Sequence, residues 1–317
     1  MQIASWKNKR VLITGSGGFI GSHLLIYLKK KGARVLGISR HPKNKKLEKK
    51  VDVSNFRALE KVFSAFRPHV CFHLASEALV ESGQEFPFET FDNNISNTLN
   101  ILELCRRKHI ERVIIASTVH VYGDSPSPYS EEHPARPSRP YETSKTAADL
   151  IAQSYADTFG LPVLIPRFVN VYGPGDKNSS RIIPKTIQTI ISGAELTMWG
   201  GKAERDYLHI DDAIRAYDLL ARINDKQMGK NRIFNFGTSK PISAETLIKL
   251  IAKLSQHNHP IKKIQNAREN EVSVQQVSWK KAKRILGWTP KKSLTIGLSE
   301  TIVWYKKHHV PVKRNEK

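Results

Sequence analysis

A glycine loop near the N-terminus constrains the fold of this chain more than any other feature. Residues 14–21 read Thr-Gly-Ser-Gly-Gly-Phe-Ile-Gly, between an apolar run at 10–14 and a helical stretch at 19–31. Glycine at 15 permits a tight turn, glycine at 18 lets backbone N–H groups approach a pyrophosphate, and glycine at 21 allows a helix to pack closely on a strand. The loop therefore predicts a strand-turn-helix unit that binds a dinucleotide.

The rest of the N-terminal half continues this alternation. Short runs of apolar and β-branched residues at 34–39, 70–75, 112–117 and 163–166 alternate with helical stretches at 55–66, 90–108 and 141–159. Such alternation is typical of a doubly wound parallel sheet. We predict an α/β protein with a Rossmann domain over 1–170, to which about 206–240 return, and a smaller α/β substrate-binding domain over 171–317. A ligand is expected in the cleft between them.

Local capping residues mark two helix ends in this half. Ser54 is expected to cap the start of the helix at 55–66, because its hydroxyl can accept a hydrogen bond from a free backbone N–H. Gly32 is expected to end the first helix, because glycine adopts the left-handed conformation found there.

The second and third apolar runs complete the expected cofactor site. Ser39 and Arg40 end the second run, where a protein selective for NAD usually carries an acid for the ribose 2′-hydroxyl. A hydroxyl and a guanidinium suit a 2′-phosphate instead, so NADP is favoured over NAD, which stays open. Asp52 is placed to meet the adenine amino group. The full expected set is Gly15, Gly18, Phe19, Ile20, Gly21, Ser39, Arg40, Asp52, Val53, Leu74, Ala75, Tyr141 and Lys145.

Four side chains form a candidate catalytic group. Ser117 and Thr118 follow the strand at 112–116, and Tyr141 and Lys145 are four residues apart on one helix face. The lysine ammonium and an oxidised nicotinamide are both expected to lower the pKa of the Tyr141 phenol, which makes it a general base near neutral pH. The Thr118 hydroxyl is expected to bond the same substrate oxygen. Together they would remove a proton from an alcohol while hydride leaves its carbon.

At these residues the sequence resembles the extended short-chain dehydrogenases/reductases, specifically the NAD(P)-dependent epimerase/dehydratase family that acts on nucleotide sugars. The resemblance covers nearly the whole chain and includes His73-Leu74-Ala75, Val121-Tyr122-Gly123 and the segments 167–175, 205–212 and 286–290. It implies that Asn170, Arg205 and Arg268 contact the pyrophosphate of a nucleotide-diphosphate sugar, with Arg181 as a further candidate. It also implies a homodimer formed through the helices at 90–108 and 141–159.

The residues after Thr118 bear on which reaction follows. The family resemblance implies oxidation at sugar C4 as the first step, and its 4,6-dehydratases carry Asp-Glu directly after the catalytic threonine. Val119 and His120 stand there in this chain. Valine cannot exchange protons, so we favour a 4-epimerase. A 4,6-dehydratase that uses His120 in place of the acidic pair is the alternative, because histidine titrates near neutral pH. A catalytically silent NADP-binding interaction protein is the remote alternative.

Composition limits the other classes of partner. The chain has 51 Lys+Arg against 29 Asp+Glu, a net charge of +22. These charges lie in scattered runs, such as Lys43 to Lys50 in an expected surface loop, without interleaved aromatics, so we expect no specific nucleic-acid binding. No apolar run approaches the roughly 20 residues that span a bilayer, and we expect no membrane association and no signal peptide. Cys71 and Cys105 lie in apolar segments, which predicts buried thiols, no metal site and a cytoplasmic location.

Overall fold

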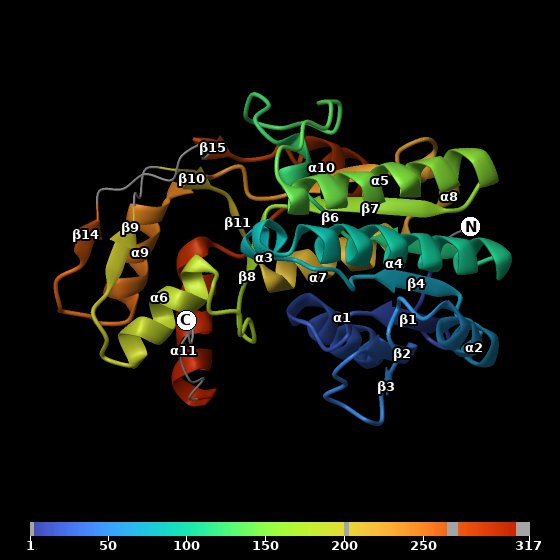
Figure 1. The fold of residues 1–317 in the computed structure, drawn as a ribbon, viewed down its shortest axis with the longest axis horizontal. Helices are drawn as coiled ribbons and strands as arrows, with labels where there is room; N and C mark the ends of the chain where they lie inside the picture. Colours follow the sequence, from blue (N-terminus) through green and yellow to red (C-terminus); the bar gives the residue numbers. More distant parts are fainter. Residues whose placement is uncertain (1–2, 200–202, 265–271, 309–317) are drawn as a thin grey trace.

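A parallel sheet forms the centre of the computed structural model, which describes residues 3–199, 203–264 and 272–308. Its strand order is β12-β7-β5-β4-β1-β2-β3, all neighbours are parallel, and β6 pairs with β7 (Figure 1). The predicted α/β Rossmann fold is confirmed. The strands are β1 (Arg10–Thr14), β2 (Arg34–Ser39), β3 (Glu48–Lys50), β4 (Val70–His73), β5 (Arg112–Ile115), β6 (Ser117–Thr118), β7 (Val163–Phe168) and β12 (Ile233–Phe236).

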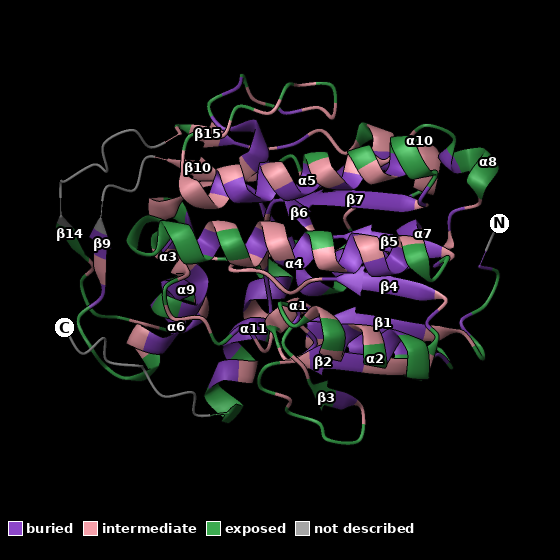
Figure 2. Ribbon diagram, turned by 45° about the vertical axis from the view of Figure 1, so that its right-hand side comes forward, coloured by how far each residue is buried: buried purple, intermediate pink, exposed green. Residues whose placement is uncertain are grey.

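Helices cover both faces of this sheet. One layer contains α1 (Phe19–Lys30), α7 (Ile210–Arg222) and α10 (Lys280–Leu286), and the other contains α2 (Phe56–Phe66), α4 (Pro87–Arg107) and α5 (Pro140–Phe159). Successive side chains of a strand point to opposite faces, so Val11 and Ile13 join the core of the first layer and Leu12 that of the second. The central strands β1, β4, β5 and β7 are therefore covered on both faces and almost entirely buried, whereas the edge strand β3 is partly exposed (Figure 2).

A second group of elements lies at one end of the sheet (Figure 1). Its helices α6 (Ile182–Ile191), α9 (Ala244–Leu254) and α11 (Leu294–His308) pack around Ile187, Leu247 and Leu298. Three small sheets join this group: β8 (Asn170–Tyr172) with β11 (Tyr207–His209), β9 (Thr197–Trp199) with β14 (Lys262–Ile264), and β10 (Glu204–Arg205) with β13 (Ile242–Ser243) and β15 (Val274–Gln275). Short helices α3 (Val80–Glu85) and α8 (Asp225–Met228) and a 3₁₀ turn (Val119–Tyr122) complete the described elements.

The lysine-rich segment at 43–50 differs from its prediction. Residues 48–50 form the edge strand β3 beside β2, not a surface loop. The reason is Glu48, whose buried carboxylate accepts hydrogen bonds from the Ser16 hydroxyl at 2.6 Å and from the backbone N–H groups of Lys43 and Asn44. These bonds attach the segment to the glycine loop, while the exposed lysines suit the edge of a sheet.

The other local predictions are mostly confirmed. Asn55, not Ser54, caps α2, because its side chain accepts from the Ala58 N–H at 3.0 Å. Gly32 follows the cap residue of α1 and has a φ of +89°, the left-handed conformation expected of it. Cys71 and Cys105 are free and buried. Among the described helices, none combines the length and apolarity that crossing a membrane requires.

Candidate active site

A cleft of about 1120 Å³ opens at the carboxyl ends of β1, β2, β4 and β5, facing the second group of elements. Every predicted site residue within the described part of the chain lines this cleft. Arg268 lies outside the described residues. The predicted residues in the lining are Gly15, Gly18, Phe19, Ile20, Gly21, Ser39, Arg40, Asp52, Val53, Leu74, Ala75, Ser117, Thr118, His120, Tyr141, Lys145, Asn170, Arg181 and Arg205.

The glycine loop has the geometry that an anionic ligand needs. Gly15 has a φ of +67°, and a Cβ at this position would lie 2.7 Å from the backbone nitrogen of Ala75. Gly18 begins α1 without any side-chain cap, and the first turn of the helix contains no acid. The first N–H groups of α1 are therefore left for a ligand, and the helix dipole favours a negative one. These features fit the pyrophosphate of a dinucleotide.

Thr14, the last residue of β1, joins the glycine loop to the end of β4. Its Oγ1 accepts hydrogen bonds from the backbone N–H groups of Leu74 and Ala75, both at 3.1 Å, and lies 2.8 Å from Nδ1 of His73. With both acceptor positions of its oxygen used, Thr14 donates its hydroxyl proton to His73. This network fixes the backbone that lines the cleft beside Gly15.

The second ring nitrogen of His73 determines its protonation. Thr98 donates its hydroxyl to the Asn94 carbonyl at 2.7 Å, and its oxygen lies 3.3 Å from His73 Nε2. Nε2 therefore carries the proton and His73 is a neutral imidazole of one tautomer. Burial, with a smaller contribution from the Lys145 charge, lowers the pKa of His73 to about 3.

Thr118, Tyr141 and Lys145 meet at the floor of the cleft. The Thr118 hydroxyl lies beside Tyr141, where it acts to lower the pKa of the phenol, and the Lys145 ammonium donates to the Ala116 carbonyl at 2.6 Å. Burial lowers the pKa of Lys145 to about 8. The pKa of Tyr141 is raised, against our prediction, because burial outweighs the opposite effects of the Thr118 hydrogen bond and the Arg181 charge.

Ser117 is tied to a structural network. Its hydroxyl donates to Asp149 at 2.8 Å, and the same carboxylate is paired with Arg167 at 2.9 Å. All three side chains are buried. The Ser117 proton is thus directed to Asp149 of α5, while Thr118 is the hydroxyl beside Tyr141.

His120 has two partners that the sequence did not reveal. Its Nδ1 lies 3.6 Å from Oε1 of Glu142 and 3.4 Å from the side-chain nitrogen of Gln275, and its ring meets the Tyr141 ring edge-on with centroids 6.0 Å apart. Glu142 directly follows Tyr141 in the sequence. An acidic residue next to the expected catalytic tyrosine was therefore the sequence feature that could have indicated this partner of His120. Gln275 is 155 residues away from His120 in the sequence, and no sequence pattern indicated their contact.

The candidate diphosphate ligands lie on the opposite wall. Asn170 is on β8, and Arg205 is on β10, where its guanidinium donates to the Glu204 and Val272 carbonyls at 2.9 and 2.8 Å. Arg181 precedes α6 and pairs with Asp176 at 3.0 Å. These three residues place two guanidiniums and an amide in the cleft opposite the glycine loop.

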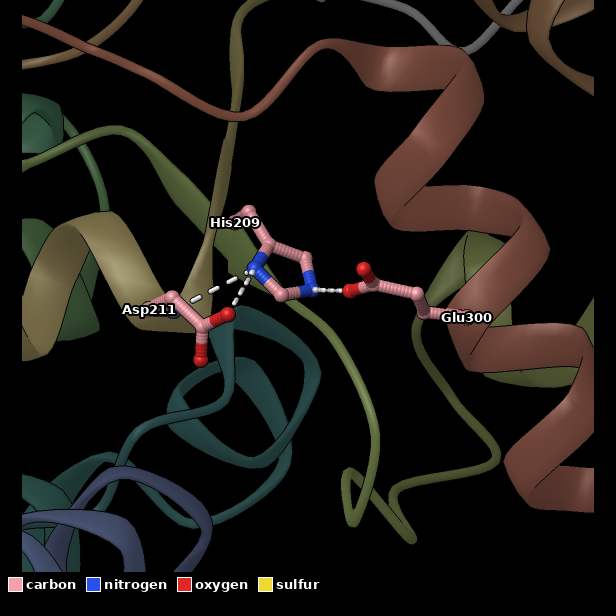
Figure 3. Close-up of side chains that lie close together, drawn as sticks. All are labelled: His209, Asp211 and Glu300. Carbon is pink, nitrogen blue, oxygen red and sulfur yellow. Dashed lines mark hydrogen bonds and ion pairs between the residues drawn. The ribbon is translucent and has the colours of Figure 1, made fainter.

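One further cluster lies outside the cleft lining. His209, Asp211 and Glu300 are the group in the described ranges that brings three metal-capable side chains together (Figure 3). His209 Nδ1 accepts from the Asp211 N–H at 3.3 Å, and Lys292 lies 2.7 Å from Glu300 and 3.4 Å from Asp211. Because the Lys292 ammonium already pairs with both carboxylates, we assign the cluster to joining α7 with α11.

Comparisons with known proteins agree with this geometry. The model of the "NAD dependent epimerase/dehydratase family" matches residues 11–237. The chain is 30% identical over 316 residues to a UDP-glucuronate 4-epimerase of Thermodesulfobacterium geofontis, covering 94% of this chain and 96% of that protein. It is also 32% identical to a dTDP-D-glucose 4,6-dehydratase of Dictyostelium discoideum, over 78% of this chain and 62% of that protein.

A solved structure is similar over the same length. The UDP-glucose 4-epimerase of Thermus thermophilus, in complex with NAD, aligns with a TM-score of 0.86 and 26% identity over 94% of this chain and 99% of that one. Fold, glycine loop and family match point to one class of enzyme. This chain belongs to the NAD dependent epimerase/dehydratase family.

Proposed function

We propose that this chain is a nucleotide-sugar 4-epimerase that inverts C4 of the sugar through transient oxidation. The observation that carries the proposal is the contrast between Thr118 and Val119. The Thr118 hydroxyl lies beside Tyr141 in the cleft and acts to lower the pKa of its phenol, while Val119 is 2% exposed and packed in the apolar core. An epimerase needs a group that removes and returns the O4 proton, and no acid at position 119.

The side chains of this chain would handle that proton. Bound nicotinamide, when present, supplies hydride acceptance from C4 and hydride return. Tyr141 takes the O4 proton and gives it back, and Thr118 aligns the same oxygen. Because burial raises the pKa of Tyr141, its phenolate needs positive charge nearby, and Arg181 is a cation that opposes the effect of burial. Asn170, Arg205 and Arg181 would hold the diphosphate of the substrate.

The test is direct. Purified protein is incubated with UDP-glucuronate, UDP-glucose or dTDP-glucose and NAD or NADP, and the products are followed by NMR and mass spectrometry. An isobaric C4 epimer is expected. Unchanged spectra across the panel, with cofactor bound, would contradict the proposal and favour a catalytically silent NADP-binding protein.

A 4,6-dehydratase is the second candidate, and the position of His120 favours it. This side chain lines the cleft beside Tyr141 at the position after Val119, and it has a carboxylate partner in Glu142. A histidine there can exchange a proton with the sugar. Loss of one water from the nucleotide sugar in the same assay would establish this reaction in place of epimerisation.

We also propose NADP as the preferred cofactor. Ser39 ends β2, Arg40 follows it, and both line the cleft, while Lys43 reaches back to the Gly17 carbonyl. The Ser39 hydroxyl lies so close to the glycine loop that a Cβ at Gly17 would be 2.7 Å from it. One hydroxyl and two cations next to the glycine loop suit a ribose 2′-phosphate.

A homodimer through α4 and α5 is proposed as the assembly. The two helices run side by side on the outer layer (Figures 1 and 2), and Phe88, Leu99 and Leu150 on them are 78%, 37% and 55% exposed. A second copy would cover these side chains in a four-helix bundle. Light scattering after gel filtration is expected to give twice the chain mass, and Leu150→Lys is expected to give the monomer. A monomeric parent protein would contradict the proposal.

A further inference from the structure

His120 is held by two residues from distant parts of the chain. Its Nδ1 faces Glu142 of α5 at 3.6 Å and the Gln275 amide of β15 at 3.4 Å. Glu142 is buried and also accepts hydrogen bonds from Ser138. His120 lines the cleft and its side chain is 22% exposed, whereas neither partner lines the cleft. His120 therefore lies in the cleft, and Glu142 lies behind it.

The Gln275 amide indicates which nitrogen of His120 carries the proton. With the amide nitrogen toward His120, the Gln275 oxygen is buried and has no hydrogen-bond partner among the described residues. A half-turn of the amide places the oxygen at Nδ1, where a ring proton satisfies it, and moves the amide nitrogen to the position without a partner. The Glu142 carboxylate, 3.6 Å from Nδ1, favours a proton on that nitrogen, and Nε2 is left with its lone pair. That is the tautomer of a histidine that accepts a proton.

We propose that His120 and Glu142 form a second proton-transfer pair in this cleft, which exchanges a proton on a sugar carbon adjacent to C4. The inference rests on the proposed function, because a ketone at C4 is what makes the neighbouring C–H bonds acidic. His120 is the group that meets the substrate, and Glu142 is a positioning residue that orients the ring.

The proposed proton exchange needs only the 4-keto sugar and the side chains of the cleft. Nε2 of His120 takes the proton from the carbon beside C4, the C–H electron pair forms a double bond to C4, and the carbonyl electrons move to O4. Thr118 and Tyr141, which meet at the cleft floor, stabilise the charge on O4. Return of a proton from the imidazolium restores the ketone. In D₂O a deuteron is returned from His120 to the same face of that carbon.

The experiment measures deuterium at C3 and C5 by NMR. The protein and cofactor are incubated in D₂O with a nucleotide sugar, and separately with a nucleotide 4-keto sugar at a concentration at which calorimetry shows it bound. Exchange well above the buffer rate is expected at one of these carbons. His120→Gln is expected to lower the exchange rate at least about 100-fold, the usual scale of general-base catalysis. Glu142→Gln is expected to lower it about tenfold or more.

Matched variants separate this role from a structural one. His133→Gln and Glu131→Gln remove the same side-chain types at positions outside the cleft lining and are expected to exchange like the parent. Glu142→Asp keeps the charge and is expected to recover part of the rate lost in Glu142→Gln. The ratio of exchange to C4 inversion is compared, because a misfolded site would lower both.

The experiment can refute the proton-transfer pair and the 4-epimerase independently of each other. Exchange of the supplied ketone at the buffer rate, or a His120→Gln protein as fast as the parent, overturns the proton-transfer pair even if C4 is inverted. Exchange that depends on His120 without C4 inversion keeps the pair and overturns the epimerase.

Discussion

One buried histidine, His73, should make this protein less stable in mild acid. His73 is 3% exposed, accepts a proton from Thr14 at Nδ1 and donates from Nε2 to Thr98. A second ring proton would point at the Thr14 hydroxyl, whose oxygen is already used by the Leu74 and Ala75 N–H groups. The pKa of about 3 in the folded chain compares with about 6.5 for an unfolded histidine.

The sign and size of the pH effect on stability follow from the difference between the folded and unfolded pKa values of His73. Between these two pKa values the unfolded chain binds one proton more than the folded chain, so acid favours unfolding. The contribution of His73 to the free energy of unfolding is complete above the unfolded pKa and decreases as the pH falls. The slope approaches about 1.4 kcal/mol per pH unit, which gives a loss of about 2 kcal/mol between pH 7 and pH 5.

Urea unfolding at pH 7, 6 and 5 measures this loss in the parent and in His73→Gln. Glutamine stays neutral throughout, so the variant should be less stable at pH 7, by about 1–3 kcal/mol for the lost hydrogen bonds. Its further loss down to pH 5 should be about 2 kcal/mol smaller than that of the parent. His133→Gln, a half-buried histidine, serves as the control. Equal pH dependence of His73→Gln and the parent would refute the assigned tautomer and its depressed pKa.

Three further outcomes are expected. Tyr141→Phe should lower kcat at least about 100-fold while NADPH fluorescence titration shows unchanged binding; full turnover would remove Tyr141 from the mechanism. Arg40→Ala should weaken NADPH binding about 10- to 100-fold and leave NADH binding unchanged, whereas equal weakening of both would exclude a 2′-phosphate contact. Asp149→Asn should lower the free energy of unfolding by about 3–5 kcal/mol, because Arg167 remains buried without its partner, and a urea midpoint like that of the parent would contradict this.

Local sequence patterns were sufficient for the sheet and the glycine loop. Continuous apolar runs such as 112–115 and glycines at fixed spacing reflect local requirements, namely burial on both faces and close backbone approach. Features that depend on contacts between distant segments were not predictable. Glu48 stood in a lysine run that resembled a solvated loop, and neither its contact with Ser16 nor the pairing of that segment with β2 was visible in the sequence. The Tyr141 pKa was misjudged because burial cannot be derived from a four-residue spacing to Lys145.

The positions of the candidate catalytic side chains explain how one fold could support different reactions of the sugar. Thr118, Tyr141 and Lys145 stand on β6 and α5, which pack directly on the Rossmann sheet. His120 additionally contacts Gln275, and Gln275 is aligned with Arg205 in the parallel pair of β10 and β15. Binding of the substrate diphosphate at Arg205 would therefore fix the strand that holds the imidazole. In the proposed mechanism, oxidation at C4 would depend on Thr118, Tyr141 and Lys145, whereas proton exchange beside C4 would also depend on the paired strands β10 and β15, which carry Arg205 and Gln275.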